Sequence, residues 1–230
     1  MGAPSIVATT HESESRALTP RLKLDHLVYA VPDLAASIES FEHRLGQAPR
    51  AGGRHVGLGT HNAILPLANE CYVELIAIDP DADKPNHPHP FGLDSLDGPR
   101  LVTWAVRSRS IESDVERART QGYDPGAVLS MSRRSPSGEL LEWKLTLRVD
   151  AIGDGIVPFV IDWGKTPHPA SIAAGQLGEL ELEMFCGDHP HRDPIQQALD
   201  ALNVEFELGV LAERKLTARI KGPRGRMMLN

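Results

Sequence analysis

Several hallmarks of common protein classes are missing from this chain. It has two cysteines, Cys71 and Cys186, far apart and without Cys-x-x-Cys spacing, which argues against a disulfide framework or a structural zinc site. No apolar run approaches the roughly 18–20 residues that a membrane-spanning helix needs, and the first residues lack the order of a signal peptide. Gly-x-Ser-x-Gly, Walker and dinucleotide-binding motifs are also absent, so we expect no nucleotide cofactor. These absences favour a cytoplasmic protein that does not enter a membrane.

Basic residues are scarce relative to acidic ones. With 31 acidic against 24 basic residues the net charge is −7, which argues against a nucleic-acid partner. What the chain does have is ten histidines, a mild excess that favours metal binding or acid–base chemistry. Its 230 residues, 41% of them hydrophobic, can bury a substantial core as one large or two small domains.

The spacing of apolar residues predicts a repeated α+β unit. Residues 23–79 contain an expected strand, helix and three strands, at 24–31, 33–45, 48–55, 60–67 and 71–78, with Asp33 capping the helix and Gly46 ending it. After a polar connector at 80–100, residues 101–170 repeat this order, with strands at 101–106, 123–131, 140–149 and 156–163 and a helix at 110–121 capped by Ser110. Residues 171–230 predict a degenerate third βαββ segment, and residues 1–22 a disordered tail. A period of about 77 residues indicates a duplicated module.

Polar side chains interrupt the predicted strand pair at 60–78. Glu74 lies inside the apolar run Tyr-Val-Glu-Leu-Ile, where a carboxylate is costly to bury without a partner. His61 and Asn62 lie on the paired strand, and because adjacent residues face opposite sides, only one of them shares the face of Glu74. A turn centred between residues 68 and 69 sets residue 63 opposite Glu74 and selects His61, whereas a shift of half a residue selects Asn62.

The two copies differ at the positions that correspond to His26 and Glu74. Leu101 stands where the first copy has His26, and Asp162 lies on the strand that corresponds to the strand of Glu74. Any metal site in such a protein would therefore be one-sided.

Several segments together resemble the glyoxalase-like members of the vicinal oxygen chelate superfamily over roughly residues 24–169. They are DHLVYAVPDL at 25–34, GRHVGLGTHNAIL at 53–65, YVELI at 72–76, SPSGELLEWKL at 135–145 and PFVIDWG at 158–164. The resemblance implies paired βαβββ modules, whose curled mixed sheets surround a cavity, with an extra C-terminal α/β segment. It also implies a divalent metal held by a first-strand residue, here His26, and by a fourth-strand glutamate, here Glu74.

A third ligand completes the expected metal site. Ligand chemistry favours His61, and a His26–His61–Glu74 set suits Zn, Fe, Mn or Ni and leaves positions open for substrate. The alternative is a plain His26–Glu74 hydrogen bond, since a buried acid–imidazole pair is a catalytic candidate without any ion.

Further polar and aromatic residues are candidates for substrate binding. Arg54 and His55 follow two glycines on a bend, where they would hold an anionic substrate; the alternative for Arg54 is an ion pair at the strand end. The remaining candidates are Asn62 and Asp162, the second of which is also a possible base or arginine partner.

Two tryptophans and an arginine pair suggest an aromatic-walled pocket. Trp143 and Trp163 lie on predicted strands, and Arg133 and Arg134 are placed at the lip of a predicted loop. Such a pocket suits a carboxylate-bearing or cyclic ligand, and the alternative is that both tryptophans belong to the core.

Three functions remain open on the sequence. The first is a metal-dependent lyase, isomerase or dioxygenase acting on a small molecule with vicinal oxygens. The second is a non-catalytic protein of the same fold that binds or sequesters a drug-like molecule. The third is an enzyme without a cofactor that uses Glu74 or Asp162 as base with His26. The modules could pair within one chain or across a homodimer.

Overall fold

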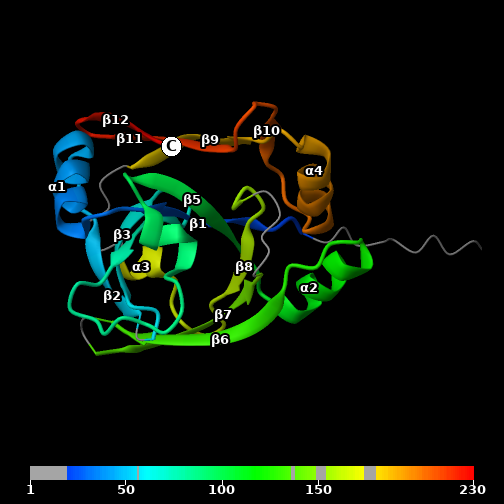
Figure 1. Ribbon diagram of the computed structural model, residues 1–230, viewed down its shortest axis with the longest axis horizontal. Coiled ribbons are helices and arrows are strands. Elements are labelled where there is room, and N and C mark those ends of the chain that lie inside the picture. The colour runs from blue at the N-terminus through cyan, green and yellow to red at the C-terminus, as the bar shows by residue number, and fades with distance from the viewer. Residues whose placement is uncertain (1–19, 56, 136–137, 149–153, 174–179) are drawn as a thin grey trace, which may run out of the picture.

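Two β-sheets of eight and four strands dominate the computed structural model, which describes residues 20–55, 57–135, 138–148, 154–173 and 180–230. The α+β fold class predicted from the sequence is confirmed (Figure 1). In chain order the elements are β1 (Lys23–Ala30), α1 (Leu34–Leu45), β2 (Arg50–His55), β3 (Thr60–Leu67), β4 (Cys71–Ile78), η1 (Pro90–Ser95), β5 (Arg100–Arg107), α2 (Ile111–Thr120), β6 (Ala127–Arg134), β7 (Leu140–Leu147), β8 (Phe159–Asp162), α3 (Pro169–Ala173), β9 (Glu181–Asp188), α4 (Arg192–Ala201), β10 (Glu207–Gly209), β11 (Lys215–Gly222) and β12 (Gly225–Leu229).

The eight-stranded sheet joins two βαβββ units within one chain. Its strand order is β2-β3-β4-β1-β5-β8-β7-β6, with β1 parallel to β4 and antiparallel to β5. The sheet curls until its edge strands β2 and β6 approach each other, and the Arg133 guanidinium donates a hydrogen bond to the Gly52 carbonyl across the gap. The curled sheet therefore surrounds an interior, as the resemblance implies.

Local sequence explains how the first helix begins and ends. The Asp33 side chain accepts a hydrogen bond from the Ala36 backbone N–H at 3.0 Å, which is the expected N-cap contact. Gly46 adopts a left-handed φ of 86° and its N–H bonds to the Glu42 carbonyl, which ends the helix.

The second helix is capped differently from the prediction. The Ser110 hydroxyl donates to the neighbouring Arg109 carbonyl and makes no cap contact. Instead, Asp162 accepts from the Ile111 backbone N–H at 3.3 Å and from the Gly164 backbone N–H at 2.9 Å. The prediction of a Ser110 cap is wrong because a carboxylate from β8 occupies that position.

Several elements begin, end or occur where the sequence did not predict them. Strand β6 runs to Arg134, so Arg133 and Arg134 lie on a strand rather than at the lip of a loop. The polar connector contains the short helix η1, and α3 follows the second unit. In η1, Phe91 and Gly92 both have positive φ, a conformation that apolar periodicity does not predict.

The main core lies on the outer face of the curled sheet. Its largest buried cluster joins alternate residues of β1 and β5 to α1, α2, α4 and the C-terminal sheet. Figure 1 shows the C-terminal sheet lying across β1 and β5. Because residues alternate along a strand, the opposite set of side chains points into the curl.

The third segment pairs differently from the first two. Its sheet order is β10-β9-β11-β12, so β9 lies between a parallel and an antiparallel neighbour. The last predicted strand is present as β12. Of the predicted tail, residues 1–19 lie outside the described part, whereas Pro20 and Leu22 bond to Asn203 rather than being free. No helix in the described ranges has the length and hydropathy to cross a membrane.

Candidate functional site

The inner face of the curled sheet lines a cavity of about 1040 Å³. Most of its wall is apolar or aromatic, including Ile64, Ile76, Leu145, Phe159 and Ile161. Polar side chains line it as well: His26, His55, Asn62 and Glu74 from the first module, Arg133 from β6, and elsewhere His87, Arg100, Arg148, Asp154 and Arg214. A large apolar cavity with few polar groups is the usual form of a small-molecule site.

His26 and Glu74 come together because β1 and β4 are neighbours. Val28 pairs with Glu74 and His26 pairs with Tyr72, so the side chains of His26 and Glu74 lie on the same face, diagonal to each other. His26 Nε2 lies 3.7 Å from Glu74 Oε2, and the side chains are 3% and 13% exposed. This separation is too long for a hydrogen bond and leaves both atoms available to a ligand.

The hairpin register selects Asn62 rather than His61. Glu74 pairs with Ile64, which puts Asn62 on its face, and the Asn62 amide donates to Glu74 Oε1 at 2.5 Å. His61 pairs with Ala77 and points to the other side of the sheet, outside the cavity wall. The predicted register was wrong by half a residue because the turn spans three residues and is centred on Asn69.

Asn62 links Glu74 to His55. The same amide nitrogen lies 3.4 Å from His55 Nε2, and His55 Nδ1 lies 3.0 Å from the Thr60 hydroxyl. Burial lowers the pKa of His55, the charge of Glu74 raises it less, and Arg133 lowers it further. A neutral His55 that donates from Nδ1 leaves Nε2 as an acceptor for Asn62.

Two consecutive glycines make room for these polar groups. A Cβ atom on Gly52 would lie 2.2 Å from Asn62 Oδ1, and a Cβ atom on Gly53 would lie 2.8 Å from Arg133 Nη1. Gly53 also has a φ of 144°, which L-residues rarely adopt. The glycine pair in β2 is therefore required by the site, not only by the bend.

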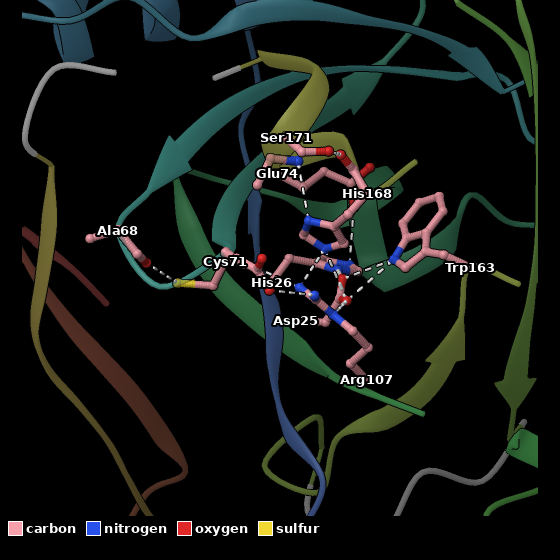
Figure 2. Close-up of polar contacts among 11 residues, drawn as sticks. Asp25, His26, Ala68, Cys71, Glu74, Arg107, Trp163, His168 and Ser171 are labelled. Atoms are coloured by element: carbon pink, nitrogen blue, oxygen red, sulfur yellow. Dashed lines mark hydrogen bonds and ion pairs between the residues drawn. The ribbon is translucent and has the colours of Figure 1, made fainter. Parts of the chain in front are cut away.

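Asp25 is a buried carboxylate that the sequence interpretation missed. Its Oδ1 lies 2.7 Å from His26 Nδ1, and its Oδ2 accepts from Arg107 Nε at 2.7 Å and from His168 Nε2 at 3.1 Å. The Trp163 indole N–H points to the same carboxylate at 3.2 Å, as Figure 2 shows. Asp25 is an acid inside an apolar strand, which is the signal that singled out Glu74.

The surroundings of Asp25 fix its charge and the orientation of His26. Burial raises the pKa of Asp25, but hydrogen bonds and charge from His168 and His26 outweigh it, so the pKa lies well below its usual range. The ionised carboxylate accepts only, so His26 Nδ1 carries the hydrogen and Nε2 faces Glu74. The ring also stacks on Tyr72, with centroids 4.6 Å apart and planes 14° apart.

The remaining predicted residues divide between the cavity wall and the outside. Trp143 and Trp163 both line the cavity, with ring centroids 5.4 Å apart. Arg54 is outside it, paired with Asp81 at 2.6 Å and Asp79 at 3.3 Å, as in the ion-pair alternative. Asp162 is outside as well, because its oxygens bind the start of α2 and the backbone of Gly164.

The pairing register corrects the comparison of the two modules. The two modules are related by a rotation that exchanges β1 with β5 and makes Leu27 equivalent to Trp104. Under this rotation His26 is equivalent to Thr103, not to Leu101. Because Val28 pairs with Glu74 and Ala105 pairs with Phe159, the same rotation carries Glu74 onto Phe159, not Asp162. The second module thus presents a hydroxyl and an aromatic ring to the cavity.

This donor set does not fit a metal centre shared by both modules. The vicinal oxygen chelate superfamily commonly holds a divalent metal. Thr103 and Phe159 supply no imidazole or carboxylate, and Glu74 Oε1 is already bonded to Asn62. Within the described residues, no three His, Cys, Asp or Glu side chains are arranged to hold an ion.

The structure defines a chain in which two βαβββ units surround a cavity. Residues 24–203 match the glyoxalase-like domain family, so the chain belongs to that family and to the glyoxalase/vicinal oxygen chelate superfamily. No curated protein matches the sequence.

Comparison with solved structures finds similar chains at low sequence identity. A hypothetical protein from Staphylococcus aureus is 14% identical with a TM-score of 0.67, over 91% of this chain and 99% of that chain. A methylmalonyl-CoA epimerase from Mycobacterium tuberculosis is 22% identical with a TM-score of 0.45, over 70% of this chain and 98% of its own. A Streptomyces coelicolor methylmalonyl-CoA epimerase in complex with 2-nitronate-propionyl-CoA is 16% identical with a TM-score of 0.45, over 65% of this chain and 100% of its own. The likeness to the Staphylococcus aureus protein concerns the fold alone.

Proposed function

We propose that this protein is an enzyme that moves a proton at a carbon next to a carbonyl group of a small, largely apolar molecule, with Glu74 as the base. The observation that carries the proposal is the pair formed by Glu74 Oε2 and His26 Nε2, which face each other at 3.7 Å on the cavity wall. A proton-transfer pair needs two such groups within reach of one substrate atom.

Each polar neighbour has a definite part in this reaction. Asn62 donates to Glu74 Oε1, which holds the carboxylate in place and leaves Oε2 for the substrate. Asp25 accepts from His26 Nδ1 and balances the imidazolium that forms when Nε2 takes a proton. Glu74 takes the proton as the C–H bond breaks, and the electron pair moves to the carbonyl oxygen. Glu74 then returns that proton to carbon, or passes it to His26 Nε2, which returns it from the other side of the pair.

The decisive test is exchange of carbon-bound hydrogen with solvent. The protein would be incubated in D₂O with a panel of ketones, aldehydes and thioesters, and deuterium incorporation followed by NMR. We expect Glu74→Gln to lower the exchange rate by at least about 100-fold, the usual contribution of a general base. Glu39→Gln, which alters an exposed carboxylate on α1, is the matched control and should exchange like the native protein.

Removal of metal by a chelator distinguishes this reaction from a metal-dependent one. Protein treated with a chelator should keep its exchange activity. Activity that is lost on chelation and restored by one equivalent of Zn²⁺, Fe²⁺, Mn²⁺ or Ni²⁺ would overturn the proposal, as would full exchange by Glu74→Gln.

A non-catalytic binding protein is the second candidate, and the size and apolar wall of the cavity favour it. In that case carbonyl compounds would bind with the same affinity to native protein and to Glu74→Gln, with no exchange in either. The aromatic pair Trp143 and Trp163 would then supply much of the contact area.

A further inference from the structure

Arg133 is a buried cation with very few partners. It is 8% exposed, and it lines the cavity from strand β6. Among the described residues its guanidinium makes one hydrogen bond, to the Gly52 carbonyl, and no carboxylate lies within ion-pair distance. A guanidinium has five N–H donors, so most of them are left for another acceptor. Burying a charge in this way is costly unless something else satisfies it.

The contacts of Arg133 bring it to the Glu74 side of the cavity. Its Nη1 bonds to the Gly52 carbonyl, Gly52 lies against the Asn62 side chain, and Asn62 bonds to Glu74. The missing side chain of Gly53 leaves the space through which Nη1 reaches β2. Burial lowers the pKa of Arg133 and the charge of Glu74 raises it, and Arg133 in turn lowers the pKa of His55. The guanidinium therefore lies where its charge acts on Glu74 and His55.

We propose that the Arg133 guanidinium binds the oxygen of an uncharged carbonyl substrate and stabilises the negative charge that develops there. This inference rests on the proposed function of Glu74. When Glu74 takes a proton it becomes neutral, and the charge it loses appears on the substrate oxygen. The cation that faced Glu74 then faces the enolate, so the net charge of the site does not change.

The charge balance also defines the substrate class. A substrate that carried its own carboxylate at this position would add a second negative charge beside Glu74. An uncharged ketone, aldehyde or thioester does not, and its oxygen becomes anionic only in the transition state. A donor that is already in position stabilises such charge without rearrangement. Arg133 would thereby supply the electrophile that a metal ion supplies elsewhere.

A purely structural role for Arg133 predicts something different. Its bond to the Gly52 carbonyl joins β6 to β2 where the sheet curls closed. If that were its whole role, loss of the guanidinium would lower stability without changing the preference of the cavity for anions over neutral molecules. The two roles are therefore separable by a binding measurement.

The test uses a stable mimic of the enolate in a protein that cannot turn over. Glu74→Gln imitates the protonated base, and 4-nitrophenolate and 4-nitroanisole differ in the charge on one oxygen. Calorimetry should show that the phenolate binds at least about tenfold more tightly than the anisole, as expected for a hydrogen-bonded charge. Adding Arg133→Met should abolish that preference.

Arg134→Met is the matched control, because Arg134 is the next residue, is exposed, and among the described residues its side chain bonds to the Gly138 carbonyl alone. It should keep the preference within about twofold. Arg133→Lys retains the charge and should keep part of the preference, which guards against a misfolded methionine variant. Equal affinities for the two probes in Glu74→Gln, no phenolate binding, or an unchanged preference in Arg133→Met would overturn the proposal. Since no turnover is needed, these results stand apart from the exchange test.

Discussion

At Asp25 a single carboxylate receives hydrogen bonds from four side chains, those of His26, Arg107, Trp163 and His168. His168 precedes α3; its Nδ1 accepts from the Ala170 backbone N–H, and its Nε2 lies 3.1 Å from Asp25 Oδ2 and 2.8 Å from Arg107 Nη2. Asp25 thus links β1 to β5, to the residue that follows β8 and to the residue that precedes α3. Asp25 is a positioning residue for His26.

Asp25→Asn should be strongly destabilising. The Asp25 side chain is fully buried, and a neutral asparagine there would leave Arg107 without its buried ion-pair partner. Removing one partner of a buried ion pair costs about 3–5 kcal/mol in the free energy of unfolding. Urea unfolding would measure this, with Asp83→Asn, an exposed aspartate on the connector, as the control. A loss below about 1 kcal/mol would contradict the assignment.

The same substitution has a predictable pH dependence. Because the folded pKa of Asp25 lies below its model-compound value of 3.8, the contribution of its charge is fully present above that value. It is lost as the pH falls from there toward the folded pKa. The difference in the free energy of unfolding between native protein and Asp25→Asn should therefore be constant at neutral pH and become smaller in acid.

Part of the site was predictable from residue type alone. Glu74 stood out because it interrupts an apolar strand, and the resemblance to the superfamily implied His26; the structure brings the two together on neighbouring strands. Arg133 contributes to the cavity because the curled sheet brings β6 next to β2, which are distant in sequence. The sequence suggested Arg133 as a pocket residue, but no local pattern predicts the contact between β6 and β2 that buries it next to the first module.

At the scale of single elements, Asp162 should act as the cap of α2. Asp162→Ala removes the acceptor for the Ile111 backbone N–H and should cost about 1 kcal/mol of unfolding free energy. Ser110→Ala, the substitution that the sequence pattern would nominate, should change stability by only a few tenths of a kcal/mol. Chemical denaturation of both variants decides between the two caps, and a larger effect at Ser110 would reverse the assignment.

Most strands and helices were predictable, because alternation and the 3.6-residue period are local signals. The hairpin register was not, since it depends on turn geometry. Residues 68–70 form a three-residue turn in which Asn69 and Glu70 have positive φ, at 62° and 56°. Neither residue is a glycine, so the usual sequence signal for such a turn is missing. That half-residue error exchanged Asn62 for His61 in the predicted site.

At the scale of the whole molecule, one chain completes the cavity. The modules pair through β1 and β5 of the same chain, and the chain's own C-terminal sheet covers the outer face of those strands. We therefore expect one ligand per chain at every protein concentration, measured by calorimetry with 4-nitrophenolate on Glu74→Gln. Whether the protein also forms a homodimer, which the sequence left open, is a question for light scattering. Binding that appears only with dimer formation would contradict a site built within one chain.

The unequal halves of the sheet have a consequence for engineering. Thr103 and Phe159 occupy the backbone positions that His26 and Glu74 occupy on the other side of the β1–β5 seam. The molecule therefore contains a second copy of the same scaffold that lacks the reactive side chains. Reactive side chains introduced at these two positions would act in the same cavity, in the same solvent and on the same substrate as the original pair. The two pairs could therefore be compared directly.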